Sequence, residues 1–495
     1  MEHGGWQPIE FGYGCFKVTP RFDDDLSLRK SNAMVASFGK KLVIASSFIV
    51  SILTSGFAEE PFPGGWTTAS PREEIRPSFS FEAMGGPDKT GSLIITHDAR
   101  EGLDGHFQKE FDVEGGQSYL FKAIRKTVNV KSPRRSALVR VLWQDARGQM
   151  VFADVPAWHV KQLGHTPTAE PEHPVDGATD DHGWTEVTGL YCAPSKATRA
   201  IVELHLQWAP EGRIEWSEVD FKQGKPVAKR PVILATIHFR PSGISPRANC
   251  EEYASLIADA AKQHADLVVL GETVPSVGVK HVPHKLAEAV PGPTTDYFGQ
   301  IAKQNHIHVV LSLYEREAHL VYNTAVLIDA EGDLIGKYRK VCLPHGEVEK
   351  GIAPGNDYPV FDTTFGRVGL MVCYDGFFPE VARELSNRGA EVIAWPVWGC
   401  NPLLAQARAC ENHVYVVSST FMDSNQNWMN SAIYDQTGEP IAVAKDWGTV
   451  AVAEVDLSQP YVGPYNLGDF HSMIPRHRPL VTSEVGETLR RPLTK

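Results

Sequence analysis

The stretch Gly366–Ile393, GRVGLMVCYDGFFPEVARELSNRGAEVI, decides the fold of the C-terminal half of this 495-residue chain. Its apolar run Val368–Val372 predicts a buried strand, and the following segment Pro379–Arg388 predicts a helix. A second strand is expected at Val392–Trp395. Cys373 ends the first strand, at a sharp turn into the helix. Strand, helix and strand in this order indicate an α/β layered domain.

The same alternation extends along the chain on both sides of this stretch. Helix Glu251–Ala265 is expected because its apolar residues recur at spacings of three and four. The other expected elements are strands Pro231–Ile237, Asp266–Leu270, Val309–Leu313 and Val414–Ser418, and helix Tyr297–Gln304. We therefore expect one α/β domain over residues 231–458.

Three side chains of this domain carry complementary chemistry. Glu272 follows the apolar strand of DLVVLGE, at a strand end, where α/β folds place their active sites. Lys340 ends the segment LIGKYRK, and Cys373 offers a thiol. A thiol reacts as thiolate, which a carboxylate can produce by taking the proton and an ammonium can stabilise. Glu272, Lys340 and Cys373 together supply these three functions.

Four segments of the chain resemble, in order and spacing, the nitrilase superfamily of carbon-nitrogen hydrolases. They are DLVVLGE ending at Glu272, YNTAVLIDAEGDLIGKYRK ending at Lys340, the stretch around Cys373, and ARACENHVYVV from Ala407. The resemblance covers about residues 230–457. It implies a four-layer α-β-β-α sandwich.

The resemblance also implies roles for these residues. Cys373 is the nucleophile that hydrolyses a non-peptide amide or nitrile through a thioester, with Glu272 as base and Lys340 as electrophilic helper. Lys340 and the backbone N–H of Tyr374 are expected to hold the oxyanion.

The family uses a second glutamate in the loop after the lysine, and LPHGEVEKGIAPG offers both Glu347 and Glu349. The spacing before Pro354 favours Glu349, which leaves Glu347 as a solvated loop carboxylate. Cys342 is a departure, because many relatives carry His at this position. It bears on the subgroup and not on the three main residues.

The residues after the nucleophile, Tyr374 and Asp375, resemble amidase and carbamoylase members more than true nitrilases, which commonly carry Trp-Glu there. We expect a small-molecule amide or N-carbamoyl (ureido) substrate. Two alternatives stay open: a true nitrilase acting on nitriles, and a secreted glycan-binding protein whose hydrolase domain is inert. Asp375 has two possible roles, substrate contact or stabilisation of the turn. We also expect a homo-oligomer, a dimer or higher, with residues 459–495 as a C-terminal arm that packs on a partner subunit.

Residues 59–222 read as a different kind of domain. Short alternating runs such as Leu138–Trp143, Ala200–Leu206 and Ile214–Phe221 lie between Gly, Pro and Asp clusters, and they predict an antiparallel, jelly-roll-like β-sandwich. The Pro-, Asp- and Thr-rich segment His165–Gly183 is expected as a long loop. Residues 223–230 form the linker to the α/β domain.

This sandwich resembles the galactose-binding-like, carbohydrate-binding modules of extracellular enzymes. The resemblance rests on Gly65-Trp66, Gly115–Tyr119, Trp184 and Ala193-Pro194. A glycan ligand is possible because tryptophan stacks on sugar rings, but burial in the core is the favoured role of such residues. The six tryptophans concerned are Trp66, Trp143, Trp158, Trp184, Trp208 and Trp216.

A secretory signal is expected at residues 34–58. Lys40 and Lys41 precede the uncharged run LVIASSFIVSILTSGFA, and Gly56 and Ala58 match a cleavage site. Translation from Met34 would make residues 1–33 a non-native extension, and cleavage would expose Glu59. The protein is then secreted or periplasmic. The alternative is a membrane anchor formed by the same run, which is short for a membrane span.

Composition narrows the remaining choices. The 48 Lys and Arg against 60 Asp and Glu give a net charge of −12, which disfavours nucleic acid as a partner. The seven cysteines include no CxxC pair, so neither a zinc site of that kind nor a disulfide framework is expected. No phosphate-loop glycine spacing is present, and we expect neither a metal nor an organic cofactor.

Overall fold

The computed structural model describes residues 62–155, 160, 164–423 and 430–458. Our expectations for residues 1–33, 34–58 and 459–495, and for Trp158, fall outside these described residues. Within them, no helix is long and apolar enough to cross a membrane.

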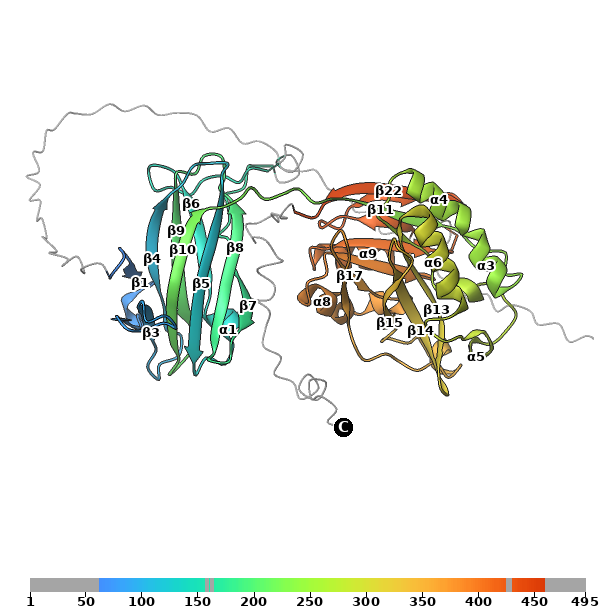
Figure 1. Ribbon diagram of the computed structural model, residues 1–495, viewed down its shortest axis with the longest axis horizontal. Coiled ribbons are helices and arrows are strands. Elements are labelled where there is room, and N and C mark those ends of the chain that lie inside the picture. Colours follow the sequence, from blue (N-terminus) through green and yellow to red (C-terminus); the bar gives the residue numbers. More distant parts are fainter. Residues whose placement is uncertain (1–61, 156–159, 161–163, 424–429, 459–495) are drawn as a thin grey trace, which may run out of the picture. The chain divides into compact units, whose positions relative to one another are not determined.

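The N-terminal domain consists of two antiparallel sheets that share one core (Figure 1). The four-stranded sheet has the order β1 (Thr67–Ala69), β4 (Asp104–Asp112), β9 (Arg199–Gln207) and β6 (Val139–Gln144). The six-stranded sheet has the order β2 (Ser78–Glu82), β3 (Ser92–Thr96), β10 (Arg213–Gln223), β5 (Ser118–Val128), β8 (Trp184–Cys192) and β7 (Val175–Thr179). Two short helices, η1 (Glu73–Ile75) and α1 (Pro133–Ser136), lie in the connections. This arrangement agrees with the expected β-sandwich.

The core of the sandwich follows from the two-residue period of its strands. In β9, Val202 and Leu204 are fully buried, whereas Glu203 between them lies on the opposite face. Trp143 and Trp216, one from each sheet, are fully buried in the same core. Trp66 is also buried, Trp184 is half-buried, and Trp208 keeps 48% of its surface exposed. Core filling is thus the main use of these tryptophans.

The expected long loop at His165–Gly183 is wrong for part of its length. Val175–Thr179 forms β7, which pairs with β8 at the edge of the six-stranded sheet. All five residues of β7 are exposed. An edge strand with no buried face shows no apolar alternation, so its sequence resembles that of a loop.

The C-terminal domain is built on two six-stranded sheets (Figure 1). The first sheet has the order β15 (Leu334–Arg339), β14 (Leu320–Ile328), β13 (His308–Glu317), β12 (Leu267–Val269), β11 (Pro231–His238) and β22 (Thr449–Asp456). The second has the order β16 (Val360–Asp362), β17 (Arg367–Leu370), β18 (Val392–Val397), β19 (Tyr415–Thr420), β20 (Ser431–Tyr434) and β21 (Pro440–Ala444). The longer helices are α3 (Pro246–Glu252), α4 (Ala254–Lys262), α6 (Pro293–Asn305), α8 (Pro379–Asn387) and α9 (Pro402–Cys410). The short ones are η2 (Val274–Ser276), α5 (Pro283–Leu286), α7 (His345–Val348) and η3 (Cys373–Phe377).

These elements form four layers. Strands β11, β12 and β13 pack against β18 and β19, so that Leu234 of the first sheet and Ile393 of the second share one core. Helices α4 and α6 bury Ile257 and Phe298 against the outer face of the first sheet. Helices α8 and α9 cover the second sheet, where Leu385 is fully buried. The expected four-layer α-β-β-α sandwich is confirmed.

The helix expected at Glu251–Ala265 differs from the observed elements. Helix α3 begins earlier, because the Ser245 hydroxyl accepts the Ala248 N–H at 3.1 Å and Pro246 follows as the first helical residue. Tyr253 separates α3 from α4, and α4 ends at Lys262. The spacing of apolar residues therefore predicted the buried face of these helices, whereas the capping residues determine where the helices begin and end.

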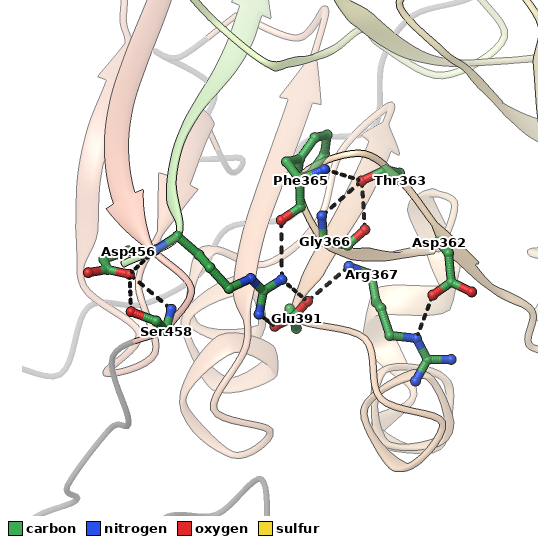
Figure 2. Close-up of polar contacts among 9 residues, drawn as sticks. Asp362, Thr363, Phe365, Gly366, Arg367, Glu391, Asp456 and Ser458 are labelled. Carbon is green, nitrogen blue, oxygen red and sulfur yellow. Dashed lines mark hydrogen bonds and ion pairs between the residues drawn. The ribbon is translucent and has the colours of Figure 1, made fainter. Parts of the chain in front are cut away.

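Polar contacts join the two sheets where Glu391 precedes β18 and Asp456 ends β22, two residues that Figure 2 labels. Both of them bind Arg230, the residue before β11. The Arg230 guanidinium donates to both carboxylate oxygens of Glu391 at 2.6 and 3.0 Å, and the Arg230 backbone N–H donates to Asp456 Oδ1 at 3.0 Å. Glu391 also accepts the backbone N–H of Arg367, the first residue of β17, at 2.9 Å. These contacts hold the start of β11 and the end of β22 beside the starts of β17 and β18.

We predict that Trp143→Ala lowers the free energy of unfolding of the sandwich by about 3–5 kcal/mol, because it opens a cavity in a fully buried position. Calorimetric unfolding of the full chain measures this change. Trp208→Ala is the matched control; its ring is half exposed and contacts the Arg135 guanidinium, so we expect at most about 1 kcal/mol. Equal effects of the two substitutions would contradict the assigned core.

Candidate active site

Glu272 lies at the carboxyl end of β12, in the parallel part of the first sheet. The chain turns at Thr273, whose φ of 45° is in the left-handed region and whose N–H donates to Ser312 Oγ at 2.7 Å. Only 6% of Glu272 is exposed. The turn thus places the Glu272 carboxylate inside the domain, as expected for a strand-end site.

Lys340 directly follows β15 in the same sheet, and only 1% of it is exposed. The Lys340 backbone N–H donates to the Asn323 backbone carbonyl at 2.9 Å, and the Lys340 backbone carbonyl accepts the Gly355 N–H at 2.8 Å. A buried ammonium is costly unless opposite charges and hydrogen bonds surround it.

Two carboxylates and an amide surround the Lys340 ammonium. Lys340 Nζ lies 2.9 Å from Glu272 Oε1 and 2.8 Å from Glu347 Oε2. Asn323 Nδ2 donates to Glu272 Oε1 and to Glu347 Oε1, each at 2.8 Å. These four residues form one buried network, which we call the lysine network.

The neighbouring charges in the lysine network determine the pKa values of Lys340 and Glu347. Burial disfavours the charged form of Lys340, but Glu272, Cys373 and Glu347 outweigh this effect and hold the pKa of Lys340 well above its usual value. Burial raises the pKa of the Glu347 carboxyl, and Lys340 offsets that rise only in part. Lys340 is therefore a permanent cation at neutral pH.

The loop spacing favoured Glu349 as the second glutamate, whereas the structure places Glu347 at the lysine. Glu347 is the residue beside Lys340, on the short helix α7. The side chain of Glu349 is 64% exposed and pairs with His345 at 3.0 Å. Glu347 thus lies where Glu349 was expected, and Glu349 is the solvated carboxylate.

Cys373 begins the turn η3, shortly after β17 of the second sheet. Its φ of 43° is left-handed, and its carbonyl accepts the Trp395 Nε1–H at 3.2 Å. A Cβ on Gly376 would lie 1.9 Å from the Trp395 ring, so this turn requires glycine there. Cys373 is 7% exposed, and its Sγ lies 3.8 Å from the Gly399 carbonyl oxygen.

The charges of the lysine network change the pKa of the Cys373 thiol. Burial and the negative charge of Glu272 raise the pKa of Cys373, and the Lys340 ammonium counteracts this only in part. The fold thus brings Glu272, Lys340 and Cys373 into one site. Because the thiol keeps its proton at neutral pH, a base has to remove that proton before or during nucleophilic attack.

Asp375 has the turn-stabilising role that the sequence left open. Its carboxylate accepts the Val372 N–H at 2.9 Å, the Tyr338 hydroxyl at 2.8 Å and the Cys342 N–H at 2.8 Å. Burial raises the pKa of Asp375 to about 6, although these hydrogen bonds lower it. Tyr338 and Cys342 flank Lys340 in sequence, so Asp375 ties the cysteine turn to the lysine segment.

Two residues of this site were not identified from the sequence. Asn323 is fully buried in the apolar strand β14, and a lone amide in such a run was the available signal. Tyr338 gave no such signal, because a tyrosine in a strand usually serves packing alone.

The Tyr374 ring contacts the rings of Phe377 and Phe378 at centroid distances of 5.1 and 5.3 Å.

The arrangement is suited to acyl transfer. It combines a buried thiol, a carboxylate that can accept its proton and a fixed cation for a developing oxyanion. The described residues place no group of three metal ligands at this site.

Part of this chain is similar to known proteins. The family model for carbon-nitrogen hydrolases matches residues 236–463. A nitrilase of Pyrococcus abyssi (strain GE5 / Orsay) is 34% identical over 238 residues, which are 46% of this chain and 90% of that protein. The omega-amidase NIT2 of Mus musculus is 31% identical over 250 residues, 46% of this chain and 89% of the relative. The crystal structure of Saccharomyces cerevisiae Nit3, of branch 10 of the nitrilase superfamily, is 26% identical, covers 47% of this chain and 93% of Nit3, and has a TM-score of 0.43.

The chain covers 90% and 89% of the two curated relatives, and the range of the family model leaves the N-terminal sandwich outside. The C-terminal domain carries the four-layer fold and the buried Glu-Lys-Cys site in that same region. The chain therefore belongs to the carbon-nitrogen hydrolases of the nitrilase superfamily.

Proposed function

We propose that this hydrolase cleaves a small-molecule amide or N-carbamoyl bond through a thioester on Cys373. The observation that carries the proposal is the lysine network, in which one ammonium is held between Glu272 and Glu347 and acts on the Cys373 thiol. A merely structural cysteine has no need of a buried ammonium and base.

In the first half-reaction Glu272 takes the Sγ proton as the sulfur attacks the carbonyl carbon. The raised pKa of Cys373 requires this general-base step, because little thiolate exists beforehand. Lys340 and the backbone N–H of Tyr374 stabilise the oxyanion, and each such donor contributes about 10²–10³ in rate. The C–N bond then breaks, and ammonia or an amine leaves with the proton from Glu272.

In the second half-reaction water attacks the thioester. Glu272 takes a proton from the water, the C–S bond breaks to release the acid, and the proton returns from Glu272 to the Cys373 sulfur. Glu347 and Asn323 do not react in this scheme. They hold Lys340 and orient Glu272 through the hydrogen bonds of the lysine network.

The substrate class rests on the residues after the nucleophile. Tyr374-Asp375 favours amides and carbamoyl compounds over nitriles, and the matched relatives include proteins named omega-amidase and nitrilase. The competing hypothesis is a glycan-binding protein with an inert hydrolase domain. It is disfavoured because an inert domain would gain nothing from burying Lys340 between two carboxylates, an arrangement that costs desolvation energy.

We predict release of ammonia from amides or carbamoyl compounds by the native chain and none by Cys373→Ala, since no thioester can form. A screen of amides, N-carbamoyl compounds and nitriles for ammonia measures both. Cys250→Ala is the control, because Cys250 is also buried, on helix α3 and away from the lysine network, and its replacement should leave turnover within about threefold. Nitriles as the sole substrates would overturn the substrate class, and full activity of Cys373→Ala would overturn the mechanism.

We predict that Glu347→Gln lowers kcat about 10- to 100-fold, since it removes a charged hydrogen bond to the buried ammonium. Steady-state kinetics on the substrate found in the screen give the ratio. Glu349→Gln, two residues away and exposed, is the matched control and should change kcat less than about twofold. The reverse order would restore Glu349 as the functional glutamate.

We predict that the rate of Cys373 alkylation by iodoacetamide rises steadily between pH 7 and pH 9, because its raised pKa keeps the thiolate scarce below the ordinary thiol value of 9.0. Lys340→Met should slow the reaction at every pH in this range, since the ammonium lowers the thiol pKa. Mass spectrometry of the Cys373 peptide measures the rate. Lys350→Met, at an exposed position, is the control. A plateau near neutral pH would show a preformed thiolate and contradict the general-base step.

A further inference from the structure

The outer face of the four-stranded sheet of the sandwich carries three metal-ligating side chains side by side. His106 of β4 lies directly opposite His205 of β9, and Gln108 lies opposite Glu203. Because side chains alternate along a strand, Phe107 and Leu204 turn into the core while the two histidines and Glu203 share the outer face. The antiparallel register thus assembles the group.

The ligand atoms of these residues converge. His205 Nε2 lies 2.9 Å from Glu203 Oε2, and His106 Nε2 lies 3.6 Å from Glu203 Oε1. One ligand atom from each residue lies within 4.8 Å of the other two. Bonds of about 2.1 Å in tetrahedral geometry would place ligand atoms about 3.4 Å apart, so side-chain adjustments of about 1 Å suffice to bind one cation.

A second carboxylate stands behind His205. His205 Nδ1 lies 3.8 Å from Asp104 Oδ1, and only 2% of His205 is exposed. Among the described residues, neither of these two atoms has a hydrogen-bond partner, and neither has His106 Nδ1. A metal-bound histidine commonly donates its second N–H to a carboxylate. Asp104 is placed for that role, and His205 has no other partner for that nitrogen.

The charges also favour a cation. Asp104 and Glu203 are two carboxylates beside two imidazoles, and Arg140 reaches Glu203 Oε2 only at 4.0 Å. A divalent cation would balance both carboxylates and use the imidazole lone pairs.

We propose that His106, Glu203 and His205 bind one Zn²⁺ ion in the sandwich domain, with Asp104 orienting His205. Imidazole and carboxylate ligands suit Zn²⁺, and three protein ligands leave one coordination position open. Glu203, with Gln108 and Gln144, also lines a groove of about 590 Å³ on the same face. Glu203 therefore links the proposed site to this groove.

The test is a Co²⁺ and Zn²⁺ titration of the full chain, in a Cys373→Ala background that removes the buried thiol of the hydrolase site. Co²⁺ reports tetrahedral coordination through its visible absorption, and Zn²⁺ should displace one equivalent of it. Zn²⁺ should also raise the melting temperature of the chain, because it binds the folded sandwich. His106→Gln is the main variant, since the His106 side chain is 13% exposed and its replacement disturbs the core less than that of His205.

We expect His106→Gln and Glu203→Gln to weaken binding at least 100-fold, and Asp104→Asn to weaken it about 10- to 100-fold. His182→Gln, at an exposed position of the same domain, should bind as the parent does. Circular dichroism establishes that each variant is folded before titration. Absence of saturable binding in the parent, or equal binding by the parent and a folded His106→Gln, would overturn the proposal.

Discussion

The ammonium of Lys340, buried between Glu272 and Glu347, is the interaction on which the catalytic domain depends. Removing one member of a buried ion pair costs about 3–5 kcal/mol, because the remaining charge stays desolvated. The carboxyl ends of β12 and β15, the helix α7 and the interior of β14 therefore have to meet at one point, where Asn323 of β14 supplies the remaining hydrogen bonds. The first sheet and α7 thus provide the charged half of the site.

The second sheet provides the nucleophile, and its position is held separately. Trp395 on β18 bonds the Cys373 carbonyl and packs against Gly376, which fixes the turn from inside its own sheet. Asp375 then joins this turn to Tyr338 on β15 of the other sheet and to Cys342 in the segment that follows β15. The thiol is therefore positioned against the lysine network by hydrogen bonds that do not include its sulfur.

The sandwich shows the same relation between register and chemistry. Its core is decided by alternating apolar residues, and Trp143 and Trp216 fill the space between the sheets. The outward positions of β4 and β9 are left for polar groups, and the antiparallel pairing sets His106 beside His205. A site on such a face follows from strand pairing and not from any local motif.

The sequence by itself determined the two fold classes and the order Glu272, Lys340, Cys373, because hydrophobic periodicity and strand-end positions are local properties of the chain. Tertiary structure alone decided between Glu347 and Glu349. Residues two apart on a helix point to opposite sides, and the packing of α7 selects the side that faces Lys340. It also decided the partners of Asn323 and Asp375, and it brought His106 to Glu203 and His205. Contacts between distant segments depend on sheet register and sheet packing, which no single segment of sequence encodes.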